Sequence, residues 1–169
     1  MTLVVEDGTG LVNAESFASV LFVDTFYTNL NDASWAGTTA EKEAALRQAT
    51  NWIEENYGTL WDGVLNTDTQ ALSWPRTYVR RPSVSMSGDI YLDSNVIPND
   101  VQIATAYLAK RALSVPLTKD AKRAIKREKV EGIEREFFND SAPMTTYTDV
   151  VARLDRYVAA SSSGNRVYR

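Results

Sequence analysis

The sequence predicts a mainly α-helical protein: a bundle of about four helices with a long loop, a charged β-hairpin arm and an extended C-terminal tail. Two observations support this prediction. Four segments carry apolar residues at helical spacing, and capping or helix-breaking residues lie near their ends. A further segment, residues 125–138, instead has the charge pattern of two paired strands.

The first two helices are expected at residues 16–30 and 39–57. The first is apolar on more than one side, which indicates burial between helices or at a subunit interface. In the second, Thr38 followed by Glu41 forms a capping box, and Gly58 is suited to a left-handed C-terminal cap. The residues expected to face the core from the second helix are Ala45, Ala49, Trp52, Ile53 and Tyr57.

A loop-rich stretch follows at residues 58–97. Pro75 fixes its own φ angle and favours an extended conformation at Trp74, so this dipeptide is expected to anchor the long connection onto the body of the domain. The part from Arg80 to Gly88 is expected to form an exposed tip.

The third helix is expected at residues 98–114, with Pro98 in its first turn. A fourth helix is expected at about residues 146–159. The chain therefore reads as a single helical domain over residues 1–160, arm included, followed by a flexible tail at 161–169. A serine–glycine spacer opens that tail.

The arm is predicted from a turn at Glu131-Gly132, where glycine supplies the positive φ angle of a tight hairpin. The facing pairs would be Val130 with Ile133, Lys129 with Glu134, Glu128 with Arg135, and Arg127 with Glu136. A hairpin charged on both faces cannot be part of a core and is marginal alone, so it is expected to project and find a partner. The alternative is a charged helix, which leaves several charges unpaired and puts Gly132 in mid-helix at a cost of about 1 kcal/mol relative to Ala.

Composition excludes several kinds of chemistry. The chain has no cysteine and no histidine, so disulfides, the usual zinc sites and Ser-His-Asp catalysis are not expected. Its aspartates are scattered without convergent spacing, so neither an enzyme nor a metal or cofactor site is expected. No apolar run reaches transmembrane length and no signal peptide is apparent, so no membrane association is expected.

Charge is unevenly distributed. The formal net charge is −4, so the chain as a whole does not attract nucleic acid. Six cationic residues nevertheless fall within residues 119–129: Lys119, Lys122, Arg123, Lys126, Arg127 and Lys129. Such a strip is most often a solvated face, and the alternative is a surface that faces DNA or a protein partner.

Five motifs in order, spread over about residues 3–155, resemble the head–tail connector (adaptor) proteins of tailed bacteriophages. They are Val4–Ser16, Glu41–Thr50, Gln70–Arg76, Ile97-Pro98 and Lys126–Val130. The resemblance implies a structural virion protein in the neck, made in the host cytoplasm. Copies would form a dodecameric ring beneath the portal protein, extend the channel for passing double-stranded DNA without sequence-specific binding, and support a downstream neck or tail protein.

The resemblance also implies two contact segments. The arm would join neighbouring subunits through Lys126, Arg127, Glu128, Lys129, Glu134, Arg135 and Glu136. The tail would dock on the portal through Asn165, Arg166, Val167, Tyr168 and Arg169.

The alternative function is single-stranded-DNA binding, a label that some members of the adaptor family carry by likeness to a primosomal protein. Trp74, Arg76, Tyr78, Arg80 and Arg81 interleave aromatic rings with positive charge. Stacking platforms for unpaired bases have this composition. The competing interpretation is that Trp74 belongs to the core and the arginines lie on a solvated loop.

Overall fold

The computed structural model describes residues 2–83, 90–117, 127–130, 133–136 and 147–159. The helices are α1 (Val20–Asn29), α2 (Thr39–Tyr57), α3 (Asn99–Ala112) and α4 (Thr148–Leu154), which a 3-10 turn, η1 (Asp155–Tyr157), extends. Two pairs of short strands complete the described secondary structure. The prediction of a mainly helical protein with about four helices is confirmed.

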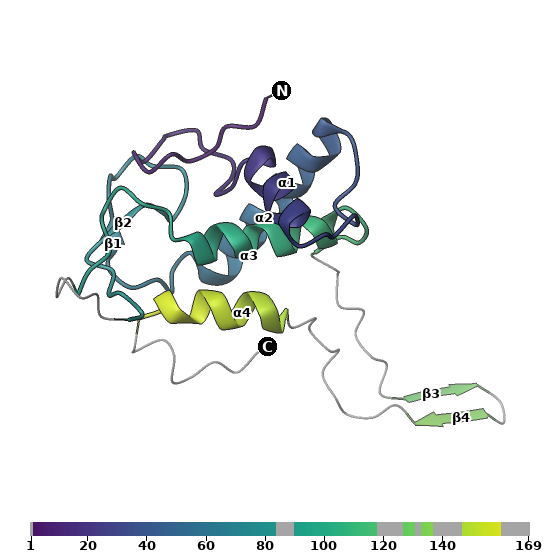
Figure 1. Cartoon of the computed structure of the whole chain (residues 1–169). Coiled ribbons are helices and arrows are strands. Elements are labelled where there is room, and N and C mark those ends of the chain that lie inside the picture. Colours follow the sequence, from purple (N-terminus) through teal and green to yellow (C-terminus); the bar gives the residue numbers. More distant parts are fainter. Residues whose placement is uncertain (1, 84–89, 118–126, 131–132, 137–146, 160–169) are drawn as a thin grey trace.

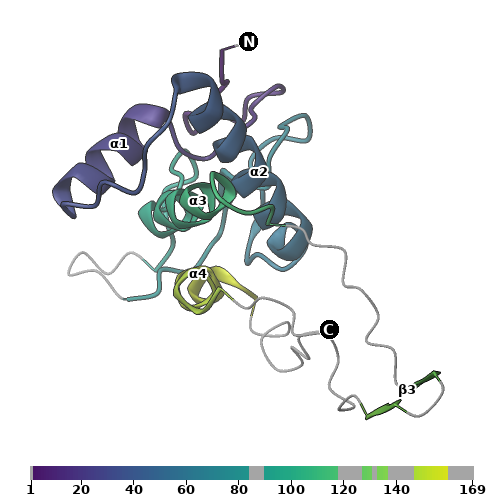
Figure 2. The same ribbon diagram turned by 90° about the vertical axis from the view of Figure 1, so that its right-hand side faces the viewer.

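Helix α3 lies at the centre of the bundle and contacts the other three helices. Helices α1 and α4 lie on opposite sides of it (Figures 1 and 2). The core between them is built from apolar residues at helical spacing on each element. Its fully buried members on α2, α3 and α4 include Leu46, Ala49, Ile53, Val101, Ala104, Leu108, Val150 and Leu154.

The predicted start of α2 is confirmed, and its predicted cap at the end is wrong. The Thr38 hydroxyl accepts a hydrogen bond from the Glu41 backbone N–H at 3.3 Å, and the Glu41 carboxylate accepts one from the Thr38 N–H at 2.7 Å. Gly58, however, has a right-handed conformation with φ −50°, and its N–H donates to the Glu54 carbonyl. The chain there continues into another right-handed turn, so no left-handed cap is needed.

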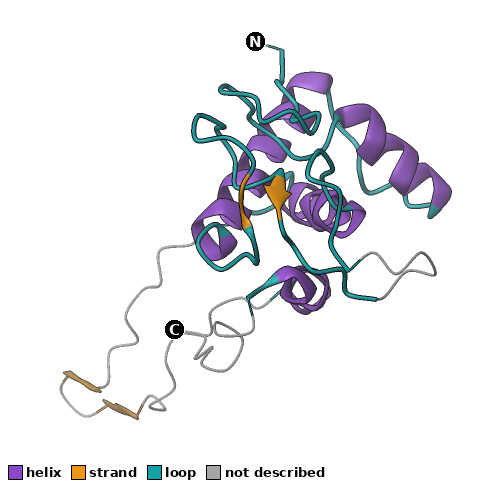
Figure 3. Ribbon diagram, turned by 90° about the vertical axis from the view of Figure 1, so that its left-hand side faces the viewer, coloured by secondary structure: helices purple, strands orange, loops and turns teal. Residues whose placement is uncertain are grey.

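The loop between α2 and α3 contains two strands that the sequence did not indicate, β1 (Val64–Leu65) and β2 (Arg76–Thr77). They pair antiparallel, with Val64 opposite Thr77, on the loop-rich side of the molecule (Figure 3). Trp74, just before β2, is fully buried, so the predicted anchor is confirmed.

The last described residues close back onto the start of this loop. The Ala159 N–H donates to the Leu60 carbonyl at 3.0 Å, and the Asp62 N–H donates to the Tyr157 carbonyl at 2.8 Å. Trp61 and Val158 form an antiparallel bridge between these contacts. The loop is thus fastened to the segment that follows α4.

The arm is a hairpin and not a helix. Strands β3 (Arg127–Val130) and β4 (Ile133–Glu136) pair antiparallel in the predicted register, from Arg127 opposite Glu136 to Val130 opposite Ile133. Figures 1 and 2 show both strands standing apart from the helices. The predicted turn at 131–132, Lys126 and the tail lie outside the described residues.

Candidate nucleic-acid interface

In the segment where aromatic and basic residues alternate, some side chains are buried and others are exposed. Trp74 and Arg76 are buried, whereas Tyr78 and Arg80 are exposed. The Arg76 guanidinium donates to the carbonyls of Asp62 and Gly63, each at 2.8 Å, and its burial lowers the pKa of the group. Trp74 and Arg76 therefore hold the loop together and are not available to a ligand.

Two backbone hydrogen bonds hold the rest of this segment, from Tyr78 to Arg81, beside residues 90–92. The Leu92 N–H donates to the Val79 carbonyl at 2.9 Å, and the Arg81 N–H donates to the Ile90 carbonyl at 2.8 Å. Val79 is fully buried, whereas Tyr78 and Arg80 on either side of it are exposed.

Tyr78 and Tyr91 form an aromatic pair on this surface. Tyr78 is 64% exposed and Tyr91 is 42% exposed. Their ring centroids lie 6.0 Å apart with the planes at 79°, an edge-to-face arrangement. Below, the four residues Tyr78, Arg80, Arg81 and Tyr91 are called the aromatic–basic loop.

The backbone of Tyr78 is held in an uncommon conformation. Its φ angle is +64°, in the left-handed region that bulky residues rarely adopt. Next to it, Gly63 also has a positive φ angle, and a Cβ atom there would lie 2.2 Å from the Thr77 carbonyl oxygen. Non-glycine residues in such regions often occur at functional sites, where the surrounding structure sustains the strain.

Arg80 differs from the other cationic groups around it. Of the lysine and arginine side chains that the structure describes, Arg80 alone has neither an acidic nor a carbonyl partner. The others are Lys42, Arg47, Arg76, Arg81, Lys110, Arg111, Arg153 and Arg156. Arg81 is among the paired ones, since its Nε donates to the Tyr91 carbonyl at 2.8 Å. The aromatic–basic loop thus contains the unpaired cation of the described surface.

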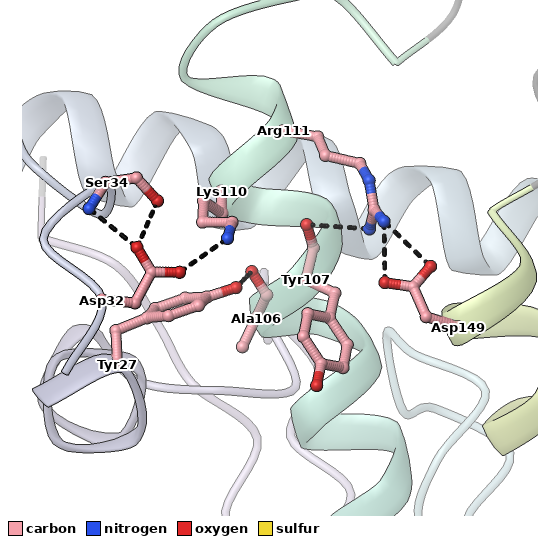
Figure 4. Close-up of polar contacts among 8 residues, drawn as sticks. All are labelled: Tyr27, Asp32, Ser34, Ala106, Tyr107, Lys110, Arg111 and Asp149. Carbon is pink, nitrogen blue, oxygen red and sulfur yellow. Dashed lines mark hydrogen bonds and ion pairs between the residues drawn. The ribbon is translucent and has the colours of Figure 1, made fainter. Parts of the chain in front are cut away.

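A pocket of about 570 Å³ lies at the C-terminal end of α3, between the residues that follow this helix up to Leu117 and the start of α4. Lys110 and Arg111 line it, and both are neutralised (Figure 4). Lys110 donates to Asp32 at 2.8 Å, and Arg111 holds both oxygens of Asp149, at 2.7 and 2.9 Å.

One pKa shift fits the pairing of Lys110. Hydrogen bonds from Lys110 and Ser34 hold the pKa of Asp32 well below its usual range. The pocket therefore lacks a free cation for a phosphate group, in contrast to the aromatic–basic loop.

The structure describes only part of the two predicted contact segments, the arm and the tail. The backbones of 127–130 and 133–136 are described, but their side chains are not, and Lys126 and the tail residues Asn165–Arg169 lie outside the described residues. The roles assigned to the arm and the tail remain predictions.

Sequence reasoning did not connect Tyr91 and Asp62 with Tyr78 and Arg80. The Asp62 carboxylate accepts a hydrogen bond from the Arg80 backbone N–H at 3.1 Å. No local pattern indicates either contact, because both join residues more than ten positions apart.

The described residues contain no group of three or more acidic side chains arranged to hold a metal ion. None of the described helices combines the length and the apolar character needed to cross a membrane.

A family model matches residues 1–169, and its family is described as "Putative DnaT-like ssDNA binding protein". No curated protein and no solved structure matches the chain.

Proposed function

The chain belongs to this DnaT-like family, and from that membership we propose that the protein binds single-stranded DNA. The observation that carries the proposal is the unpaired Arg80 beside the exposed rings of Tyr78 and Tyr91. Proteins that hold single strands without reading their sequence combine positive charge for the backbone with aromatic faces for the bases. The aromatic–basic loop offers both.

The rest of the described surface limits where DNA could bind. A net charge of −4 gives no general attraction for phosphate. The other described cations are occupied by carboxylates or carbonyl groups, as Lys110 and Arg111 are beside the pocket. A strand would therefore be held locally, at the aromatic–basic loop.

Fluorescence anisotropy tests this proposal. A labelled thymidine oligonucleotide is titrated with the full chain at low salt, and saturable binding is expected. Arg80→Ala should raise the Kd about fivefold, because it removes one cation–phosphate contact. The matched control is Arg156→Ala, which removes an exposed arginine that pairs with Asp100. Absence of any binding by the unmodified protein would refute the proposal.

A second candidate function is the head–tail adaptor that the five motifs suggest. The observation that favours it is the arm, because β3 and β4 pair with each other and stand apart from the helices. An isolated two-stranded hairpin is marginally stable and gains from a partner. Complementary charges along such a ribbon can set the register between neighbouring subunits of a ring.

Quantitative mass spectrometry of purified virions tests the adaptor function. The adaptor proposal expects this chain at about the copy number of the portal protein. Its presence in infected cells together with its absence from virions would overturn the adaptor proposal and leave DNA binding.

A further inference from the structure

We infer that the ligand of the aromatic–basic loop is the unpaired bases of a short single strand, stacked on Tyr78 and Tyr91, with one phosphate held by Arg80. This inference rests on the proposed single-stranded-DNA binding and specifies how contact is made. It follows from three features of the loop: the fixed outward position of one ring, the perpendicular arrangement of the pair, and the small number of free cations.

The ring of Tyr78 is held outward before any ligand arrives. Its left-handed backbone is fixed on one side by β2 and on the other by Val79. The Val79 side chain is fully buried, and its carbonyl accepts a hydrogen bond from the Leu92 N–H. A ring on a rigid frame loses little conformational freedom when it binds. Being 64% exposed, it presents enough surface to cover a base.

The geometry of the pair determines how bases can be arranged. Because the two ring planes are at 79°, Tyr78 and Tyr91 cannot lie on both sides of one base. Each ring offers its face to a different base, so consecutive nucleotides are accommodated in an unstacked, turned strand. A duplex keeps its bases paired and stacked, and its bases are not accessible to such rings.

Two apolar residues that adjoin the pair along the backbone are exposed. Val64 lies on β1, beside β2, and Ile90 precedes Tyr91. They are 55% and 56% exposed. These side chains suit the faces and edges of bases better than they suit phosphate. They read no hydrogen-bonding pattern, so the contact tolerates different sequences.

The number of free cations sets the salt dependence. For single strands, the logarithm of the affinity falls with the logarithm of salt concentration with a slope of about −0.7 for each phosphate neutralised. Contact through Arg80 alone gives a slope of about −0.7. Contact through the six cations of residues 119–129 would give a slope of about −4.

The experiment compares three ligands of equal length: a thymidine strand, a strand of abasic sites, and a duplex. Anisotropy titrations of the full chain at several salt concentrations give the Kd and the slope. The thymidine strand should bind at least about tenfold more tightly than the abasic strand. The duplex should bind as weakly as the abasic strand, and the slope should be shallow.

Substitutions of Tyr78 test whether its ring makes the contact with the bases. Tyr78→Leu should weaken thymidine binding about tenfold and leave abasic binding unchanged, whereas Tyr78→Phe, which keeps the ring, should bind as the unmodified protein does. Tyr147→Leu, at the pocket on the other end of α3, is the control and should have no effect. Circular dichroism confirms that each variant is folded.

The outcomes separate this inference from the proposed function. Equal binding of thymidine and abasic strands with a steep salt slope overturns the inference and leaves single-stranded-DNA binding in place, through phosphate contacts elsewhere. Failure of every single strand to bind overturns both.

Discussion

The carboxylate of Asp62 accepts a hydrogen bond from the backbone N–H of Arg80 at 3.1 Å, and the Asp62 carbonyl accepts one from the buried Arg76 guanidinium at 2.8 Å. Asp62 thereby connects the interior of the long loop with the surface that carries Tyr78. Asp62 is therefore one of the residues that position the exposed aromatic pair, and no local sequence signal marks it.

Replacing Asp62 with alanine should loosen the aromatic–basic loop without unfolding the protein. The change removes the acceptor for the Arg80 N–H, a loss of about 1 kcal/mol in the free energy of unfolding. The affinity for a thymidine strand should fall as well, because the loop that carries Tyr78 is less firmly held. Thermal unfolding and anisotropy measure the two effects.

Asp93→Ala is the matched control for that change. Asp93 is an exposed carboxylate 4.0 Å from the Arg81 guanidinium, and its removal should have little effect on either quantity. Equal effects of the two substitutions would show that Asp62 does not position the loop.

Gly63→Ala should destabilise the fold by about 2 kcal/mol or more. The φ angle there is +70°, and an added Cβ atom would lie 2.2 Å from the Thr77 carbonyl oxygen, which belongs to β2 and cannot move freely. Urea unfolding measures the change. At Gly37 the nearest atom to an added Cβ is the end of the Glu41 side chain, at 3.2 Å, but the φ angle is +153°, so Gly37→Ala should also destabilise the fold, through the backbone conformation alone.

The carboxyl group of Glu54 should make the free energy of unfolding depend on pH. Burial raises the pKa of its carboxyl above the usual value, although the Ser73 N–H and hydroxyl both donate to it, at 3.0 and 2.7 Å. A carboxyl group whose folded pKa is raised contributes stability that is fully present below the unfolded pKa and is lost as pH rises through the folded pKa.

Glu54→Gln should therefore make the protein more stable than the unmodified chain at pH 7, because the amide keeps an acceptor oxygen and carries no charge. The gain should disappear at a pH below about 4, where the carboxyl group is protonated in both states. Urea unfolding at the two pH values tests this. A gain of the same size at both would contradict the linkage to ionisation.

Reversal of one charge in the arm tests its proposed role in assembly. Lys129 lies opposite Glu134 in the hairpin register, so Glu134→Lys places like charges across the strands. Ring assembly on the portal should weaken, while the helical body keeps its thermal transition. The double variant with Lys129→Glu restores opposite charges and should recover assembly. Unimpaired assembly of the single variant would remove the arm from the subunit contact.

Local signals made part of this fold predictable. The start of α2 follows from Thr38 and Glu41, three residues apart, and the hairpin register follows from charges arranged around one glycine. Both depend on residues close together in the sequence. The prediction failed at Gly58, where glycine permits a left-handed cap but the chain continues in a right-handed turn.

For the aromatic–basic loop, the sequence indicated which residue types are present but not how their side chains are arranged. The alternation of rings and arginines from Trp74 to Arg81 left burial of Trp74 as one of two interpretations, and it did not indicate that Arg76 enters the core. Burial of an arginine depends on three carbonyls gathered around it, and β1 and β2 are too short to show strand periodicity. Such features arise from contacts between distant residues and leave no repeat in the sequence.

The bridge between Trp61 and Val158 has a consequence for synthesis. Pairings between residues far apart in sequence require closure of a long chain segment before they form, so they tend to appear late in folding. A chain still on the ribosome has already made the loop that bears Tyr78, but not the C-terminal segment that fastens it. Nascent chains, and fragments that lack residues 157–159, should therefore leave single strands unbound, and only completed copies would compete for them.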